Sequence, residues 1–490
     1  MPAEFHMNPG DLIRFLPEII LTVMATLMMV MDPILQRRSS YAFGHLSLVA
    51  LIGALGGSVY AYTEAAGTAF GGMLVVDGFA TFFRVLVIVV GILTVLSSYR
   101  FLEREDAETS EYHALLLFSI AGQCLMAASN DLIMVFIGLE ISSIASYVMA
   151  GYLRDDKRAN EAALKYFLLG SFATAFFLYG VALIYGSTGS INLSAVRGVI
   201  SSGQDPSLPV FVGLAAALMF VGLAFKVSAS PFQIWAPDVY QGAPTPVTAF
   251  LSAGPKAAAF AVFLRIFMTA FEPISASWQP WVFGVSALLS MTIGNFAALL
   301  QSNVKRMLAY SSIAHAGYVM VALTARSEIG TSAAMFYLAA YAFMNIGAFA
   351  VVSHLSGKGE RYQSVDDFAG LAQKQPLTAA MLTIFMLSLI GVPLTGGFFG
   401  KFYIFKAALE SHLVLLTVLG LLNSAVAAFY YLRILVMMYM HEPSKATSEL
   451  EPLSLGLGTA LIVPAIVTLF LGIFPSWVLD FAGKSAALVK

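Results

Sequence analysis

Long apolar stretches, separated by short polar or glycine- and proline-containing turns, run along the whole chain. A helix needs about 20 mostly apolar residues to cross the hydrocarbon core of a membrane. The pattern predicts fourteen such spans, at residues 11–31, 43–62, 76–98, 113–129, 131–152, 162–186, 209–229, 244–271, 280–301, 305–323, 331–355, 376–408, 412–440 and 454–481. We therefore expect an all-α polytopic membrane protein with about 14 transmembrane helices.

Two of these spans carry signals of an interruption. The stretch 376–408 is too long for one straight helix and contains Gly391-Val392-Pro393 and Gly396-Gly397, which predict one broken helix. The seventh span ends in Ser228-Ala229-Ser230-Pro231, and proline removes a backbone donor. The segment Ile191–Ser202 follows a Ser/Gly turn, carries few charges and is expected to lie at the membrane interface. Since no soluble linker is visible, residues 1–490 are expected to form a single transmembrane domain.

Composition supports the membrane interpretation. Hydrophobic residues make up 59% of the chain and charged residues 11%, and the mean hydropathy is +0.82. A soluble domain has about 25% charged residues. The net charge of −2 comes without a basic block, so nothing indicates a nucleic-acid partner. The single cysteine, Cys124, excludes an internal disulfide and offers no iron–sulfur ligand set.

The first apolar run also bears on targeting. It extends from Leu12 to Met31 and ends at Asp32-Pro33 without a small-residue cleavage site. The run is too long for the apolar region of a secretory signal peptide, and we expect a membrane span there instead.

The lysines and arginines predict the orientation in the membrane. Cytoplasmic loops of membrane proteins carry an excess of these residues. With the N-terminus outside, thirteen fall in cytoplasmic loops, namely Arg37, Arg38, Arg100, Arg104, Arg154, Lys157, Arg158, Lys305, Arg306, Lys358, Arg361, Lys374 and Lys445. Only four fall on the opposite side, Arg197, Arg326, Lys484 and Lys490. We therefore expect both termini on the outer side of the membrane.

The remaining nine basic residues lie inside predicted spans. A charge at the centre of a span costs roughly 2.5–3.5 kcal/mol on insertion scales, so each needs a physical reason. Arg14, Lys406 and Arg433 lie near span ends, where a long side chain can reach the headgroups. Arg84 and Arg265 are deeper and are expected to pair with a carboxylate such as Asp77 or to hold helices together.

Four charged residues resist these explanations. Glu140 lies in mid-span among apolar residues and has no basic residue one turn away. Lys226, Lys256 and Lys401 are deep, and each lies next to a helix break or a proline. Burial lowers the pKa of a lysine and a nearby carboxylate raises it again, so a buried lysine can exchange protons where an arginine cannot. The four residues are interpreted as a proton relay, with static ion pairs that fix the bundle as the alternative.

Three further residues have weaker claims. Lys165 and Lys305 lie near the starts of the sixth and tenth spans, where reaching the headgroups explains them as well as proton transfer does. His315 lies in mid-span, and histidine titrates near neutral pH. A single intramembrane histidine is equally consistent with hydrogen-bonded packing.

Motifs for other chemistry are absent from the sequence. It contains no phosphate-binding GxxxxGK[ST], no GxGxxG after a strand and no zinc-binding HExxH. No pair of histidines has the positions expected of haem ligands. We therefore expect this chain to bind no cofactor or metal itself.

Several sequence blocks resemble a known family, the antiporter-like proton-pumping subunits of respiratory complex I and of multisubunit cation/proton antiporters. The resemblance covers nearly the whole chain. Its strongest blocks are DLIMVFIGLE (131–140), EAALKYFLLG (161–170), FKVSASPFQIWAPDVYQGAPTPV (225–247), KRMLAYSSIAHAGY (305–318) and GGFFGKFY (396–403). Within the family, the opening run 12–35 and the early end after the fourteenth span look most like the subunit N group of bacterial NADH:quinone oxidoreductases.

The resemblance implies two inverted five-helix repeats, spans 4–8 (within 111–272) and 9–13 (within 278–440), after three N-terminal spans (1–110) and before a final one (454–481). Spans 7 and 12 would be broken. By motif position Glu140 and Lys226 would form a control pair, Lys256 the central relay and Lys401 the exit. Lys165, Asp238, Lys305 and His315 match with weaker claims. Relatives often have histidine after the Pro-Phe of the seventh-span loop, where this chain has Gln233, which cannot take a proton.

The resemblance also implies a setting. The chain would be a non-redox membrane subunit of a proton-translocating NADH:quinone oxidoreductase in the bacterial inner membrane, with both termini periplasmic. NADH, FMN, iron–sulfur clusters and quinone would be bound by other subunits, and its partners would be neighbouring antiporter-like and small membrane subunits and the lipid bilayer. Two alternatives stay open: a subunit of a multisubunit monovalent cation/proton antiporter, and a membrane scaffold with no transport role.

Overall fold

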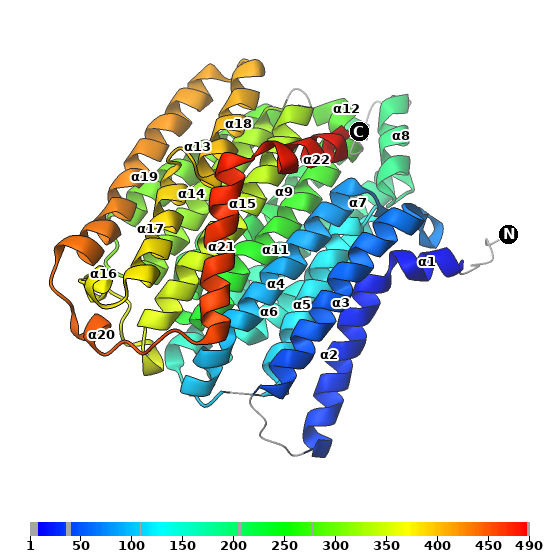
Figure 1. Ribbon diagram of the computed structural model, residues 1–490. Coiled ribbons are helices and arrows are strands. Elements are labelled where there is room, and N and C mark those ends of the chain that lie inside the picture. Colours follow the sequence, from blue (N-terminus) through cyan, green and yellow to red (C-terminus); the bar gives the residue numbers. More distant parts are fainter. Residues whose placement is uncertain (1–7, 36–40, 108, 204–207, 276–277, 488–490) are drawn as a thin grey trace.

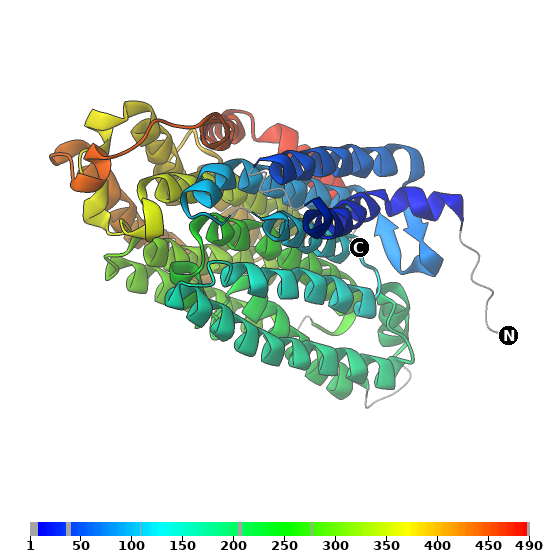
Figure 2. The same cartoon turned by 90° about the horizontal axis from the view of Figure 1, so that it is seen from below.

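A computed structural model describes residues 8–35, 41–107, 109–203, 208–275 and 278–487. Figure 1 shows one bundle of long helices that run side by side. Seen from below, in Figure 2, the helices lie in several layers, with blue helices of the N-terminal part on one side and green helices of the middle of the chain on the other. The expected all-α membrane fold is confirmed, with one small addition: β1 (Gly67–Ala69) and β2 (Leu74–Val76) form an antiparallel hairpin around the short turn η1 (Phe70–Gly72). Arg37, Arg38 and Lys490 of the charge count lie outside the described residues.

The observed helices follow the predicted spans. They are α2 (Leu16–Leu35), α3 (Ala42–Ala65), α4 (Gly78–Arg104), α5 (Ser110–Ala128), α6 (Leu132–Ala150), α7 (Lys157–Thr188), α9 (Leu208–Val227), α11 (Thr245–Arg265), α13 (Gln279–Leu299), α14 (Val304–Thr324), α15 (Glu328–Leu355), the pair α17 (Pro376–Ile390) and α18 (Gly396–Glu410), α19 (Val414–Met440) and α21 (Leu455–Ile473). Within the described residues, twelve helices are long and apolar enough to cross a membrane. The other two predicted spans correspond to α5, which is more polar, and to the divided pair.

Both predicted interruptions are present. Helix α9 ends at Val227, where Ser228 adopts a left-handed conformation (φ +61°), and the chain resumes as α10 (Ala236–Gly242). Helix α17 ends at Ile390, and Gly391 (φ +94°) turns the chain away before α18 begins. Glycine has no Cβ to oppose this conformation, which explains why the break falls there. The two five-helix repeats and their boundaries stay a prediction.

The ends of the chain differ from the predicted spans. The first apolar run is divided at Phe15 into α1 (Pro9–Arg14) and α2. The last predicted span, 454–481, is too long, because α21 stops at Ile473 and α22 (Ser476–Ala486) bends back over α15 and α4. Pro475 has no N–H to continue the ladder. Helices α1 and α22 lie toward the same upper side of the bundle in Figure 1.

Helices α11, α14 and α15 occupy the centre of the bundle. All 21 residues of α11 are buried, and α14 and α15 are almost as enclosed. The remaining short helices lie at the ends of the bundle: α8 (Leu193–Ser202), the π-helix η2 (Ile266–Ala270), α12 (Glu272–Ser275), η3 (Lys358–Glu360), η4 (Val365–Phe368), α16 (Leu371–Lys374) and α20 (Lys445–Ser448). The segment expected at the interface is α8, which buries only Leu193, Val196 and Ile200, along one face.

Candidate functional site

Lys226 lies on the last turn of α9, just before the break, and its ammonium group is enclosed by protein. It donates to the Ser143 hydroxyl at 2.8 Å and to the Tyr166 hydroxyl at 3.3 Å. The rings of Tyr166 and Tyr147 lie 5.4 and 5.7 Å from its nitrogen. Aromatic faces attract a cation without accepting its proton, so no strong proton acceptor is in contact with the Lys226 nitrogen.

Glu140 and Lys226 are neighbours without being an ion pair. Ser143, which bonds to Lys226, follows Glu140 by three residues on α6, and residues at this spacing share one helix face. Among the described residues, no contact under 4 Å joins the Glu140 carboxylate to a lysine or arginine, and its Oε1 is buried without a hydrogen-bond partner. The two charges therefore interact over a short gap that a change of side-chain conformation would open or close.

Lys256 lies at the middle of α11, after Pro255. Its ammonium group donates to the carbonyl oxygen of Ser312 at 3.0 Å and to the Ser312 hydroxyl, and the Tyr341 ring lies 6.0 Å away. No carboxylate lies within 4 Å of this ammonium group in the described part of the chain. The lysine is thus buried at the centre of the protein with only neutral partners, the least stable setting for a permanent positive charge.

His315 continues the polar line from Lys256 along α14. It follows Ser312 by three residues, and its ring contacts the hydroxyl of Tyr337 through Nδ1 (2.5 Å) and that of Tyr431 through Nε2 (3.1 Å). Tyr431 also bonds to the Ser311 hydroxyl. The ring of Tyr318, one turn further, packs edge-on against His315 and under the Lys401 ammonium group. His315 therefore lies between Lys256 and Lys401.

Lys401 lies on α18 and reaches back over the break. It donates to the carbonyl oxygens of Leu389 and Ile390, both at 2.9 Å, and to the Ser424 hydroxyl at 2.8 Å. The interruption of the helix frees these carbonyls, because the backbone donors that would bind them are displaced. A cavity of about 430 Å³ begins at Lys401 and extends along α18 to Lys406 and Glu410.

Of the weaker candidates other than His315, Lys165 and Asp238 lie together at one end of the bundle, apart from the central row. Lys165 is 41% exposed and pairs with Glu161 at 2.7 Å and with Asp238 at 2.8 Å. Asp238 also accepts from Arg306 at 2.6 Å. These contacts form a partly exposed network between α7, α10 and α14. The structure brings Lys165 and Asp238 together, but it pairs neither of them directly with Lys226.

Lys305 is fully buried, so the idea that it reaches the headgroups is wrong. It pairs with Glu360 at 2.8 Å and donates to the Ala243 carbonyl oxygen at 2.7 Å. Glu360 also accepts from the backbone N–H and the hydroxyl of Thr245. Sequence reasoning missed Glu360, because it lies in a charged loop where nothing distinguishes it from its neighbours.

The two deep arginines form separate ion pairs. Arg265 pairs with Asp77 at 3.0 Å, as the sequence predicts. Arg84 instead pairs with Glu18 at 2.6 Å, and both side chains are buried. Glu18 was missed although a signal was present, since it is an acidic residue inside the first apolar run. These pairs join α4 to α11 and to α2.

The residues near span ends find partners close by. Arg14 contacts Asp11, Lys406 lies 3.8 Å from Glu410, and Arg433 donates to a backbone carbonyl. Gln233 lies in the loop between α9 and α10, and its Oε1 is buried with no partner among the described residues. Within the same residues, no group of three or more His, Cys, Asp or Glu side chains is arranged to hold a metal ion.

Comparisons with known proteins agree with this architecture. The family described as NADH:quinone oxidoreductase/Mrp antiporter, transmembrane region, matches residues 129–427. The chain is 77% identical to NADH-quinone oxidoreductase subunit N 1 of Solibacter usitatus over the full length of both chains. It is 34% identical to a chain of respiratory complex I from Thermus thermophilus with bound aureothin, with a TM-score of 0.81 over 95% of this chain and 99% of that one.

A more distant likeness concerns the fold alone. A chain of the Mrp complex from Dietzia sp. is 22% identical, with a TM-score of 0.83 over 99% of this chain and 98% of that one. The curated relatives are named as subunits N, which confirms the resemblance to the subunit N group that the sequence indicates. This chain belongs to the NADH:quinone oxidoreductase/Mrp antiporter family of transmembrane subunits.

Proposed function

We propose that this chain conducts protons across the bacterial inner membrane through Glu140, Lys226, Lys256 and Lys401, as a membrane subunit of a proton-translocating NADH:quinone oxidoreductase. The observation that carries the proposal is the surroundings of the three lysines. Each ammonium group is buried and held by hydroxyls or carbonyl oxygens rather than by a carboxylate. A charge placed at such cost at membrane depth is by default a functional group.

The arrangement suggests how protons would move. When the Glu140 carboxylate approaches Lys226 it favours the charged lysine, and when it withdraws the lysine gives up a proton more readily. His315 and its tyrosine partners lie between Lys256 and Lys401, and hydroxyl and imidazole groups can both accept and donate protons. The cavity beside Lys401 supports an exit on the side opposite the basic loops. Protons would enter at the end of the bundle that contains Lys165, Asp238 and the Lys305–Glu360 pair.

The link to NADH rests on the relatives, which are named as subunits of NADH-quinone oxidoreductase. In that setting electron transfer would take place in partner subunits that bind NADH, FMN, iron–sulfur clusters and quinone. This chain would contribute no redox chemistry. It would contact neighbouring antiporter-like and small membrane subunits, and both of its termini would be periplasmic.

The test is NADH-driven proton uptake by inside-out membrane vesicles. We expect Lys226→Ala and Glu140→Ala each to reduce the rate by about tenfold or more, as removal of a proton-transfer group typically does. Lys445→Ala is the matched control, because Lys445 is 75% exposed and its nearest carboxylate lies 4.0 Å away. Full pumping by both variants at normal chain levels would support the scaffold alternative and reject the relay.

The antiporter alternative is favoured by one observation, the fold shared with the Mrp complex chain. An imposed sodium or potassium gradient separates the two proposals. We expect no proton movement in response to such a gradient in vesicles without NADH. We also expect the purified chain to be accompanied by flavin and iron–sulfur subunits, and purification without them would favour the antiporter.

A further inference from the structure

Two cavities lie along α4, between α3 on one side and α21 on the other. Figure 1 shows α3 and α21 in front of α4 at either side, and both helices pack against it. Each cavity is lined by residues of all three helices. One, of about 660 Å³, lies toward the basic-loop side, and the other, of about 550 Å³ and lined almost wholly by apolar side chains, lies toward the other side.

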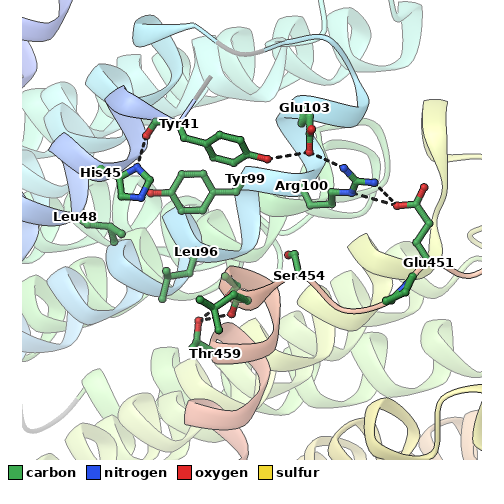
Figure 3. Close-up of a pocket in the computed structure, with 13 residues that line it drawn as sticks. Tyr41, His45, Leu48, Leu96, Tyr99, Arg100, Glu103, Glu451, Ser454 and Thr459 are labelled. Atoms are coloured by element: carbon green, nitrogen blue, oxygen red, sulfur yellow. Dashed lines mark hydrogen bonds and ion pairs between the residues drawn. The ribbon is translucent and has the colours of Figure 1, made fainter. Parts of the chain in front are cut away.

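The first cavity has a polar mouth and an apolar floor. Figure 3 shows the Arg100 guanidinium between the carboxylates of Glu103 and Glu451, with Tyr41 and Tyr99 beside it. Leu48, Leu96 and Thr459 line the part of the cavity that lies away from these charges. Tyrosines and long charged side chains are typical of the membrane–water boundary, where each has one apolar and one hydrated end. The cavity therefore matches a ligand with a polar head and an apolar tail.

The charges at the mouth specify the head. Arg100 bonds to Glu103 at 2.6 Å and to Glu451 at 2.5 Å, and Tyr41 donates to Glu103 at 2.9 Å. All these bonds fall on Oε2 of each carboxylate, and within the described residues they leave Oε1 of both to accept from a ligand. Among the described residues that line the cavity, two carboxylates face one guanidinium, which opposes an anionic headgroup and favours an ammonium group.

We propose that this cavity binds phosphatidylethanolamine, with its ammonium group on Glu103 and Glu451, its phosphate toward Arg100, and an acyl chain along α4. On α3, Val59 of the second cavity lies eleven residues after Leu48 of the first, about 16 Å along the helix at 1.5 Å per residue. That is about half of the hydrocarbon core, the depth of one leaflet.

The test uses the full chain, purified in detergent with the subunits that accompany it, stripped of lipid and then mixed with one lipid at a time. Native mass spectrometry counts the lipids retained. We expect phosphatidylethanolamine to be retained in preference to phosphatidylglycerol. In the Glu103→Gln/Glu451→Gln variant its apparent affinity should fall by about tenfold, because charge-assisted hydrogen bonds are lost.

The same loop offers a matched control. Glu449 lies two residues before Glu451 and bonds to Tyr362, outside the cavity. Glu449→Gln makes the same charge change and should leave lipid retention unaltered. Glu451→Lys should reverse the preference toward phosphatidylglycerol, which a loss of folding would not do. Equal retention of both lipids by the unmodified chain, or unchanged selectivity in the double variant, would overturn the proposal.

The alternative occupant of the first cavity is a segment of a partner protein. Leu455 lines the cavity and is 87% exposed, so a photoreactive amino acid at this position reports what covers it in native membranes. We expect crosslinks to lipid. A crosslink to another protein chain at this position would contradict the lipid site.

Discussion

At the scale of single residues, the buried charged side chains fall into two groups, those in ion pairs and those with neutral partners only. Arg84 with Glu18 and Lys305 with Glu360 are closed ion pairs, in which each charge has an opposite charge within 3 Å. Lys256 and Lys401 are buried to a similar degree with neutral partners only. A closed pair has little reason to exchange protons, whereas a lysine without a counter-charge is poised to do so. This contrast separates structural from candidate functional charges.

The Arg84–Glu18 pair provides a prediction about stability. Replacing one partner of a buried ion pair leaves an uncompensated charge and costs about 3–5 kcal/mol. We therefore expect Arg84→Met to lower the thermal unfolding temperature of the purified chain strongly, and the Arg84→Met/Glu18→Gln double variant to recover much of the loss. Arg154→Ala is the control, since the Arg154 side chain is 81% exposed and such pairs contribute little. No difference between Arg84→Met and Arg154→Ala would refute the structural role.

At the scale of elements, the two helix breaks have the same construction. Each ends a helix with a left-handed residue, Ser228 or Gly391, and each places a lysine within reach of the break. Breaks of this kind at membrane depth are tolerated where they face protein or a water-filled cavity. At the second break, Lys401 itself satisfies the carbonyl oxygens that the interruption frees.

Gly391 tests this coupling between the break and the lysine. A Cβ at this position would force a side chain into a left-handed conformation, at a cost of roughly 1–2 kcal/mol, and would lie 3.2 Å from Cδ of Lys401. We expect Gly391→Ala to displace Lys401 and to lower NADH-driven proton pumping, with the chain still inserted in the membrane. Gly458→Ala is the control, because a Cβ on Gly458 meets nothing within 4 Å. Equal pumping by the two variants would show that Lys401 does not depend on the break.

At the scale of the whole molecule, the question is which face of the membrane each end of the bundle meets. The basic loops with Lys358 and Lys374 lie at one end of the bundle, and the mouth of the cavity at Arg100 lies at the same end. Helices α8 and α22 lie at the other. The excess of lysine and arginine predicts that the first end is cytoplasmic.

Cysteine labelling decides the orientation with little interference. The only cysteine in the chain, Cys124, is free and fully buried. Lys374 and Lys484 are both exposed and lie at opposite ends of the bundle. In spheroplasts, a membrane-impermeant maleimide should label Lys484→Cys, and it should label Lys374→Cys only after the membrane is broken. The reverse pattern would invert the proposed direction of proton movement.

Much of the fold was predictable because lipid permits few solutions. Backbone groups in hydrocarbon must be satisfied within the segment, so apolar length alone indicates helices. The spans and both interruptions followed from this rule. The ends of helices were less predictable: Pro475 cut the last span short and α22 folded back, because such ends depend on contacts with α15 and α4 rather than on local hydropathy.

The sequence indicated which charged residues belong to the candidate site, but not which partner each of them contacts. A charged residue inside an apolar run is visible in one dimension, which is why Glu140, Lys226, Lys256 and Lys401 stood out. Which partner each one finds is a property of helix packing. Arg84 pairs with Glu18 and not with Asp77, and Lys305 pairs with Glu360 in a loop 55 residues away.

The sequence by itself determined that this is a helical membrane protein of one family, which charges need a reason and where two helices break, since hydropathy and local backbone chemistry decide these. Only the tertiary structure decided which charges are neutralised, that His315 and its tyrosine partners lie between Lys256 and Lys401, and that α3, α4 and α21 line a cavity with a polar mouth. Burial and pairing are set by contacts between distant segments, and the energy of a buried charge depends on those contacts more than on its own type.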